Sequence, residues 1–289
     1  MSPFSRVVEL PSTGSTNADA LALADTDPDE WPHLSVLVAQ RQTAGRGRAG
    51  REWLTGTGAG DALTASVVLR VDLPPVRTTW IPLVVALAVR RALTDLGAPA
   101  ATKWPNDVVL LGAGTEPLDG WGRSRKVAGI LVEVSPRTRA IVVGIGINVA
   151  PGSAPVAWGA GLGDVGIDVT PAQVLEALGA HLPGLVDRLV AAGGDADAAA
   201  LAEEVAEGTV TLGKRVRVTL PDDTEIVGTA GRLDPTGALV VIDRSGVEHV
   251  LVTGDVTHLR FVQTEPAVPA GDGTAGDGTV LDDETRLSG

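Results

Sequence analysis

The chain has 289 residues, of which 44% are hydrophobic and 20% are charged, and its formal net charge is −13. This is the composition of a folded globular protein, and the acidic total opposes a general nucleic-acid binder, which usually presents a basic face. The sequence contains no cysteine and only four scattered histidines, which excludes disulfide scaffolds and thiolate chemistry and opposes a His-rich zinc site.

The N-terminal segment and the hydropathy pattern predict a soluble, cytoplasmic protein with no membrane partner. The start, MSPFSRVVELPST, lacks the basic segment and the long apolar core of a signal peptide. The most apolar run, residues 81–89, is followed by two arginines. It is far shorter than the roughly 20 residues of a membrane-spanning helix.

The first half of the chain alternates between predicted strands and helices. A capping box formed by Thr16 and Asp19 predicts a helix over residues 18–25, and apolar positions on nearly all sides predict a buried helix over residues 78–96. We expect the Gly-rich segment 112–125 to be a tolerant surface insertion. Apolar and β-branched runs predict strands over residues 5–10, 35–40, 63–71, 107–111, 127–134 and 140–149.

Two further helices are predicted after a Gly/Ala/Pro-rich loop over residues 151–166, which is expected to be mobile. Thr170 as the N-cap and Pro171 as the first helical residue predict a helix that extends to Arg188. A second helix is expected over residues 195–207.

The pattern then changes to that of a small all-β module. Four short alternating runs between residues 213 and 261 are separated by the turns PDD, DPTG and RSG, as in a small barrel. The last stretch is rich in Gly, Asp and Thr and is predicted to be disordered. The chain is therefore expected to divide into an α+β domain, an all-β domain and a tail, over residues 1–208, 209–262 and 263–289.

The loop over residues 42–51 is rich in glycine and arginine. Residues 45–50 satisfy the pattern G-x-G-x-x-G, but no helix pattern follows and arginines stand where the backbone would approach a pyrophosphate, so we reject a dinucleotide site. Four arginines and no acid between residues 41 and 51 instead predict an anion-binding loop, because guanidinium groups match carboxylate and phosphate oxygens. A solvated basic loop and an RGG-like nucleic-acid segment are the alternatives.

Five motifs occur along the chain in one order. They are Ser15-Thr16-Asn17, the Gly/Arg loop 42–51 with Trp53, KWPND at 103–107, KVAGILVE at 126–133 and GIGIN at 144–148. Together these motifs resemble those of the biotin protein ligases, also called biotin–[acetyl-CoA-carboxylase] ligases. The resemblance implies a mixed-sheet catalytic domain of the biotin/lipoate ligase type, similar to class II synthetases, followed by an SH3-like barrel.

The resemblance also implies a reaction in two steps. Biotin and MgATP first give biotinyl-5′-adenylate and pyrophosphate, and a lysine of a biotin carrier domain then attacks the mixed anhydride to form an amide. The carboxylate of biotin is itself the nucleophile in the first step. Such an enzyme must therefore bring two anions together and stabilise the developing charge, which suits arginines, a lysine and Mg²⁺.

The site residues implied by the resemblance fall into three groups. Lys126 and Arg48 are the expected catalytic residues, and Asp107 is the expected Mg²⁺ ligand. The ATP and adenylate set comprises Arg48, Arg51, Lys103, Asn106, Asp107 and Asn148. The biotin set comprises Ser15, Thr16, Asn17, Gln42, Arg46, Gly47, Arg48, Lys126 and Gly129.

Plainer explanations exist for several of these residues. Ser15, Thr16 and Asn17 are also common helix caps, although hydroxyl and amide groups suit the ureido head of biotin. Lys126 could be an ordinary strand-edge lysine. Trp53 and Trp158 are candidates for aromatic walls or for core residues.

Two other functions compete with the biotin ligase. A lipoate–protein ligase-like enzyme would share the fold, but lipoate has no ureido group for Gln42 to bind. A non-catalytic biotin or nucleotide sensor would not need Lys126, Arg48 and Asp107 together. Many family members carry an N-terminal helix-turn-helix, and the first motif here begins at Ser15, so we expect a ligase without a DNA partner.

Overall fold

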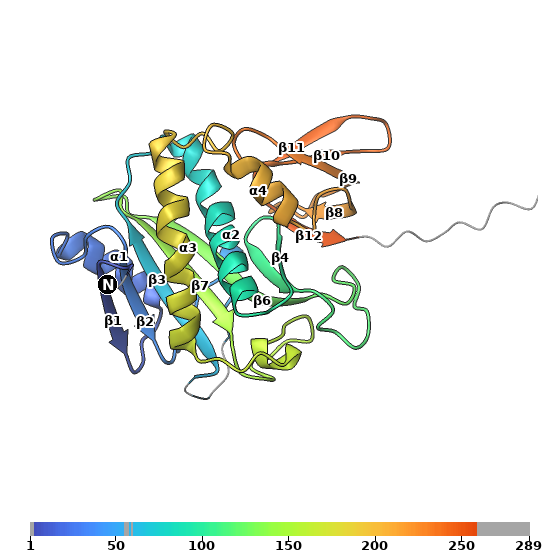
Figure 1. Cartoon of the computed structure of the whole chain (residues 1–289). Coiled ribbons are helices and arrows are strands. Elements are labelled where there is room, and N and C mark those ends of the chain that lie inside the picture. The colour runs from blue at the N-terminus through green and yellow to red at the C-terminus, as the bar shows by residue number, and fades with distance from the viewer. Residues whose placement is uncertain (1–2, 55–57, 59, 259–289) are drawn as a thin grey trace, which may run out of the picture.

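The computed structural model describes residues 3–54, 58 and 60–258, which form two sheets with helices packed around the larger one (Figure 1). The predicted tail at 263–289 lies outside the described residues. The α+β class and the all-β module after it are both confirmed.

The larger sheet has the strand order β1-β2-β3-β7-β6-β5-β4. The pair β1 and β2 is parallel, and the other pairs in this sheet are antiparallel. All six strands predicted for this half of the chain are present, and β4, a four-residue strand, is one the sequence did not predict. The strands are β1 (Arg6–Leu10), β2 (Ser35–Ala39), β3 (Ala62–Leu69), β4 (Ala100–Lys103), β5 (Asp107–Leu110), β6 (Arg125–Val134) and β7 (Ile141–Asn148).

The two faces of this sheet have different side chains. In β7, alternate residues point to opposite faces. One set is Ile141, Val143, Ile145 and Ile147, all buried in the main core, whereas the other includes Gly144 and Gly146. One face is therefore packed with branched side chains, and the centre of the other is left open.

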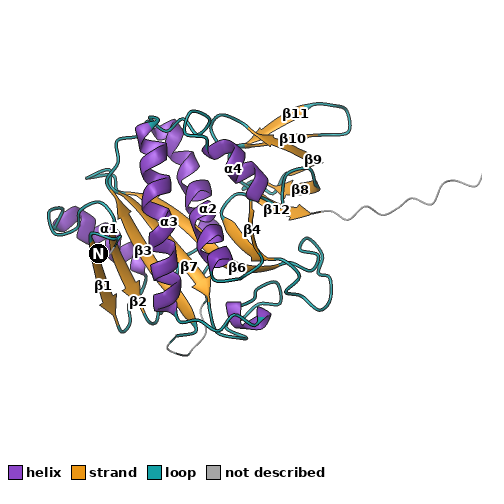
Figure 2. Cartoon of the chain, in the orientation of Figure 1, coloured by secondary structure: helices purple, strands orange, loops and turns teal. Residues whose placement is uncertain are grey.

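Two long helices cover the apolar face (Figure 2). Helix α2 (Ile81–Asp95) follows the 3-10 turn η2 (Pro75–Trp80), and α3 (Pro171–Ala191) packs beside α2. The Thr170 hydroxyl accepts from the backbone N–H of Gln173, which confirms the predicted N-cap. No helix within the described ranges is long and apolar enough to cross a bilayer.

Helix α1 (Thr16–Thr26) packs against the opposite face, over β2, β3 and β7. The predicted capping box is wrong. The N-cap is Ser15, and the Asp19 carboxylate accepts from Thr13 instead of capping the helix. The Thr16 hydroxyl does not cap the helix either, because it donates to the amide oxygen of Gln42 in the loop after β2.

The next helix begins later than the sequence predicts. Helix α4 spans Leu201–Gly208, whereas residues 195–200 form turns. The carboxylate of Asp195 accepts from the backbone N–H groups of Asp197 and Ala198, which stabilises a turn in place of a first helical turn. Ala200 has a φ of 54° and interrupts the helical path before Leu201.

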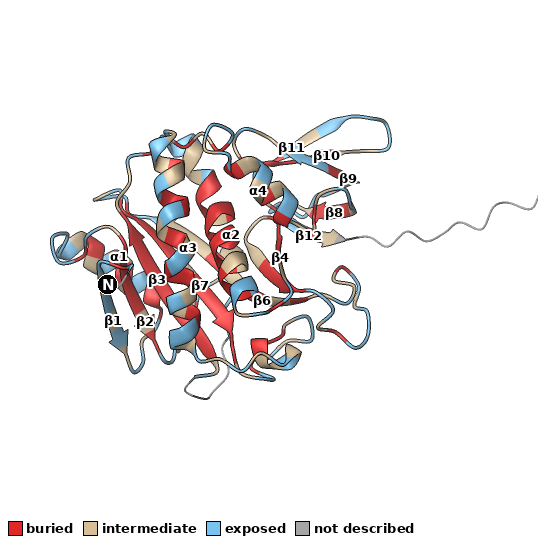
Figure 3. Cartoon of the chain, viewed as in Figure 1, coloured by how far each residue is buried: buried red, intermediate tan, exposed pale blue. Residues whose placement is uncertain are grey.

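The C-terminal module is an antiparallel sheet with the order β11-β10-β9-β8-β12. The four predicted runs became strands, and the fifth strand, β12, was not predicted. The module packs on the larger domain beside α4 (Figure 3). The Trp80 and Trp104 indoles donate to the carbonyls of Pro235 and Gly237. The strands are β8 (Arg215–Thr219), β9 (Glu225–Leu233), β10 (Leu239–Ile242), β11 (Glu248–Leu251) and β12 (Asp255–His258).

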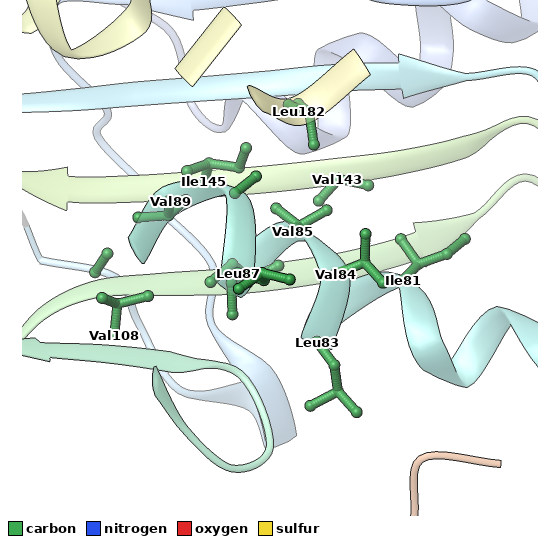
Figure 4. Close-up of a cluster of buried hydrophobic side chains, with 14 of the residues drawn as sticks. Ile81, Leu83, Val84, Val85, Leu87, Val89, Val108, Val143, Ile145 and Leu182 are labelled. Carbon is green, nitrogen blue, oxygen red and sulfur yellow. The ribbon is translucent and has the colours of Figure 1, made fainter. Parts of the chain in front are cut away.

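The position of the main core predicts that two leucines contribute very differently to the free energy of unfolding. Leu87 of α2 is fully buried among residues of the sheet and of α3 (Figure 4), whereas Leu111 is 42% exposed. We expect Leu87→Ala to lower the free energy of unfolding by about 2–5 kcal/mol, because it leaves a cavity. The matched Leu111→Ala change should cost about 0.5 kcal/mol or less. Urea denaturation measures both, and equal effects would contradict this placement of the core.

Candidate active site

A cavity of about 620 Å³ lies on the open face of the larger sheet. Its walls come from the start of α1, the loop after β2, strands β5, β6 and β7, the loop after β7, and β12. Every site residue predicted from the sequence lines it: Ser15, Thr16, Asn17, Gln42, Arg46, Gly47, Arg48, Arg51, Lys103, Asn106, Asp107, Lys126, Gly129 and Asn148.

Three glycines form the floor of the cavity. Gly129 of β6 is paired with Gly146 of β7, and Gly144 lies two residues before it on the same strand. A Cβ atom on Gly146 would lie 2.3 Å from the Trp53 ring, and one on Gly144 would lie 2.5 Å from the Asn17 amide oxygen. Only glycine leaves room there, because the Trp53 ring and the Asn17 side chain pack directly on the strand backbone.

Hydrogen-bonding side chains gather at one end of this glycine floor. The amide oxygen of Gln42 accepts from the backbone N–H and the hydroxyl of Thr16, at 2.8 and 3.0 Å. The Ser66 hydroxyl lies 2.8 Å from that of Thr16 and 2.7 Å from the amide oxygen of Asn17. Because the Gln42 oxygen is already used, its amide NH₂ is the group that is left to donate to a ligand.

Ionic side chains gather at the other end. The Lys126 ammonium lies 2.6 Å from the Asp107 carboxylate, and these side chains are 16% and 18% exposed. The Arg48 guanidinium donates to the amide oxygen of Asn106 at 2.9 Å. Burial lowers the pKa of Lys103 and of Arg48, and the Asp107 carboxylate opposes both shifts.

Two arginines of the Gly/Arg loop 42–51, which we call the covering loop, already have acidic partners, although the loop itself contains no acid between residues 41 and 51. Arg46 forms an ion pair with Glu133 at 2.8 Å, and Arg51 forms one with Asp255 at 2.8 Å. Arg41 is exposed and does not belong to the cavity lining, as far as the chain is described. Three arginines therefore serve the cavity, and a bound anion would compete with acidic and polar partners for them.

Three tryptophans enclose the ionic end. The Trp53 and Trp158 rings lie 5.6 and 5.8 Å from the Lys126 ammonium, and Trp121 lies 4.3 Å from that of Lys103. Trp53 and Trp158 were predicted as wall candidates and do line the cavity. Trp121 was missed, because its Gly-rich segment has no pattern that signals a ligand.

The C-terminal module also reaches the cavity, which the sequence did not predict. Near β12, the Thr253 hydroxyl accepts from Arg48, and the carbonyl of Val256 accepts from the Lys103 ammonium at 2.6 Å. Asp255 completes this set through its ion pair with Arg51. These contacts join residues more than 150 positions apart, so no local sequence signal could have found them.

The arrangement defines a class of ligand. The cavity has a neutral hydrogen-bonding end and a cationic end, with the glycine floor between them. It therefore suits an elongated molecule with an uncharged polar head and an anionic tail. The cations at the tail end and the aromatic rings around them also suit a nucleotide phosphate and a base. These features are typical of an enzyme or binding protein whose ligands carry anionic groups.

Known proteins with matching sequences agree with this class. Residues 9–149 match the biotin/lipoate A/B protein ligase family, and residues 211–259 match the biotin protein ligase C-terminal domain. The chain is 36% identical to the biotin–[acetyl-CoA-carboxylase] ligase of Mycobacterium tuberculosis, over 86% of this chain and 87% of that protein. It is 38% identical to the ligase of the same name from Paracoccus denitrificans, over 58% of this chain and 68% of that protein.

Solved structures agree as well. The biotin protein ligase from Aquifex aeolicus, solved in complex with biotin and ATP, superposes with a TM-score of 0.68 at 25% identity. The match covers 89% of this chain and 100% of that one. The chain belongs to the biotin protein ligase family.

The glycine floor gives a prediction that needs no ligand. In Gly146→Ala the new methyl group would overlap the Trp53 ring, so we expect the indole to leave the floor and acrylamide to quench its fluorescence more strongly. A Trp53→Phe variant supplies the background from the other tryptophans.

Gly184→Ala is the matched control, because a Cβ there meets no atom within 4 Å. It should leave Trp53 quenching unchanged and, because Gly184 lies inside α3, stabilise the fold by roughly 0.5–1 kcal/mol. Unchanged quenching in Gly146→Ala would contradict the described contact.

Proposed function

We propose that this protein activates biotin with ATP to biotinyl-5′-adenylate and transfers the biotin to a lysine of a carrier domain, such as that of acetyl-CoA carboxylase. One observation carries the proposal: a single cavity has the Thr16–Gln42 polar end and the Lys126–Asp107 ionic end on either side of a glycine floor. The names of the M. tuberculosis and A. aeolicus relatives support it.

Biotin fits this cavity in one direction. Its ureido group needs both donors and acceptors, which Ser15, Thr16, Asn17 and Gln42 supply. Its rings and chain lie over Gly129 and beside Trp53. The carboxylate then reaches the ammonium of Lys126, with Arg46, Gly47 and Arg48 of the covering loop above it.

In the first step a carboxylate oxygen of biotin attacks the α-phosphorus of ATP, and the bond to pyrophosphate breaks. The carboxylate is ionised at neutral pH, so no general base is required. Lys126 and Arg48 stabilise the negative charge that develops on the phosphoryl oxygens. We assign the rest of the nucleotide to Arg51, Lys103, Asn106 and Asn148, which line the same end of the cavity.

In the second step the neutral amine of the acceptor lysine attacks the acyl carbon of the adenylate. The C–O bond to AMP breaks, an amide forms, and the attacking nitrogen loses its proton. Lys126 and Arg48 hold the departing phosphate, which makes AMP a better leaving group.

Mg²⁺ fits the residues present at the ionic end. It prefers oxygen ligands and is often held by one or two carboxylates together with substrate phosphates. Asp107 is a largely buried carboxylate that faces the cavity, and no cluster of three or more metal-ligating side chains occurs within the described ranges. We propose that Asp107 holds a Mg²⁺ ion that arrives with ATP and neutralises phosphate charge.

The polar end favours biotin over lipoate. The free NH₂ group of Gln42 has a natural acceptor in the ureido carbonyl, whereas lipoate offers no such group. The presence of Lys126, Arg48 and Asp107 together in the cavity favours a catalyst over a sensor, because ligand recognition alone does not require all three.

Several wider statements belong to the same proposal. We propose residues 1–208 as the catalytic domain and residues 209–262 as the SH3-like domain, which completes the nucleotide end through Thr253 and Asp255. We also propose that the protein works in the cytoplasm and that its macromolecular partner is the carrier domain, with no DNA partner.

A direct assay tests the proposal. The chain is incubated with labelled biotin, ATP, Mg²⁺ and a biotin carrier domain, and covalent label on the carrier is measured. We expect label on a single lysine that depends on ATP. Transfer of lipoate instead would contradict the choice of substrate, and binding of biotin without adenylate formation would favour the sensor.

Lys126→Ala should reduce adenylate formation at least a hundredfold, because it removes about 3 kcal/mol of charge stabilisation at the reacting phosphate. ATP–pyrophosphate exchange measures this step. The exposed Lys214 provides the matched control, and Lys214→Ala should retain full exchange. Near-normal exchange in Lys126→Ala would refute the assigned role.

Arg48→Ala should speed the dissociation of biotinyl-adenylate by about tenfold to a hundredfold, the range for one lost charged hydrogen bond. The reason is that Arg48 ties the covering loop to Asn106 and Thr253. Arg41→Ala is the control, because Arg41 directly precedes this loop and is exposed outside the cavity lining. Equal dissociation rates in the two variants would count against this role of Arg48.

A further inference from the structure

The segment between β5 and β6, expected to be a tolerant insertion, is held in place by arginines. The Arg125 guanidinium donates to the carbonyls of Glu116 and Gly122 at 2.6 and 3.0 Å. The Arg123 guanidinium donates to the carbonyl of Thr115 at 2.6 Å. Because the buried Arg125 and the exposed Arg123 bind its carbonyls, this surface loop has a definite shape.

The same loop also packs on the C-terminal module. Gly120 has a φ of 72°, and a Cβ atom there would lie 2.8 Å from the Thr257 side chain of β12. The position therefore requires glycine both for its backbone conformation and for close approach. The loop is anchored at its base by Arg123 and Arg125 and at its tip by β12.

This anchored loop places Trp121 against Trp158, and both rings line the cavity. The two rings are stacked, with centroids 5.5 Å apart and planes 12° from parallel. The Trp158 segment is also bound to β6, since the Lys126 N–H donates to the carbonyl of Trp158 at 2.8 Å and the Ala160 N–H donates to that of Lys126. Trp121 thus holds the side chain of a segment whose backbone is already attached beside Lys126.

We propose that Trp121 is a positioning residue that closes the cavity by holding Trp158 in place, so that the reactive acyl-adenylate stays bound until the acceptor lysine arrives. This inference rests on the proposed function. Trp121 and Trp158 both line the cavity at the end that contains Lys103 and Lys126. We call the stacked pair the tryptophan clasp.

The chemistry explains why a clasp would be useful. An acyl-adenylate that escapes, or that meets water, is hydrolysed to biotin and AMP, and the ATP is wasted. Closing the nucleotide end retains the intermediate and excludes water from it. The Trp121 ring also covers the Lys103 ammonium at 4.3 Å, so opening the clasp would expose a buried cation to water.

The experiment compares three variants of the full chain. Trp121→Ala removes the stacking ring, Trp121→Phe keeps an aromatic face, and Thr115→Ala changes an exposed residue of the same loop. The first readout is the amount of AMP released per biotin transferred to the carrier domain. The second is kcat and KM for ATP in pyrophosphate exchange.

We expect Trp121→Ala to raise unproductive AMP release about three- to tenfold, within the range that one aromatic pair supports. The kcat of the first step should stay within twofold of the wild-type value in Thr115→Ala, whose side chain is exposed. Trp121→Phe should restore most of the coupling, and Thr115→Ala should behave as wild type. A fall in the KM for ATP with unchanged coupling would overturn the proposal, because the pair would then obstruct entry and not retain the intermediate.

A measurement without ligand separates this inference from the proposed function. Backbone amide exchange of Lys126 and Gly159, which border the Trp158 segment, should be faster in Trp121→Ala than in Thr115→Ala. Equal exchange would contradict the clasp whatever the enzyme's activity. A wild-type chain that forms no adenylate would contradict the proposed function, whereas one that forms it and loses none in Trp121→Ala would contradict the clasp alone.

Discussion

At the centre of the larger sheet, β6 and β7 carry glycines on one face and large buried apolar side chains on the other. On β7 the three isoleucines and Val143 belong to the main core, and the intervening Gly144 and Gly146 have no side chain at all. A single methyl group on either glycine would collide with Asn17 or Trp53. Because strand residues alternate in direction, one eight-residue strand supplies both the core and the floor of the site.

This constraint also separates the two chemistries of the cavity. The polar end is built on α1 and the start of the covering loop, and the ionic end on β5 and the start of β6. The glycines between them carry no side chain of their own, and the Asn17 amide and the Trp53 ring pack directly on them. The core packing of Ile145 and Ile147 behind the floor keeps the strand rigid, which fixes the distance between the ends.

The sequence predicted those features that depend on neighbours along the chain. Strands β6 and β7 have strong β-branched patterns, and Thr170 with Pro171 is a local cap, so all three were recognisable. The sequence also predicted that the motif residues share one site, and they do line one cavity. That prediction came from the family resemblance, because no periodicity of the sequence connects these segments.

The failures share a physical cause. Thr16 and Asp19 have the spacing of a capping box, but tertiary partners, Gln42 and Thr13, take both side chains. β4 has only four residues and is defined by its pairing with β5. The contact of Asp255 with the cavity exists only once the C-terminal module is packed against the larger domain, and those of Trp121 need Lys103 and Trp158 to be brought beside it. Each depends on contacts whose partners lie elsewhere in the fold.

The cations of the cavity are already occupied before any ligand arrives. Arg46 binds Glu133, Arg51 binds Asp255, and Lys126 binds Asp107. Lys126 is only 16% exposed, so an unpaired ammonium there would be costly, and Asp107 stabilises the fold. Arg51 and Asp255 are 58% and 60% exposed, and an ion pair this exposed contributes little to stability. An anionic ligand that binds these cations would therefore replace their protein acceptors with its own carboxylate or phosphate oxygens. Binding would then be an exchange of hydrogen-bonding partners.

That exchange connects the two domains. The acceptors of Arg48, Arg51 and Lys103 include Thr253, Asp255 and the carbonyl of Val256, all from one short segment of the C-terminal module. The same segment packs on Gly120 of the anchored loop. The cations of the ionic end, the C-terminal module and the loop between β5 and β6 are therefore held together by one connected set of contacts.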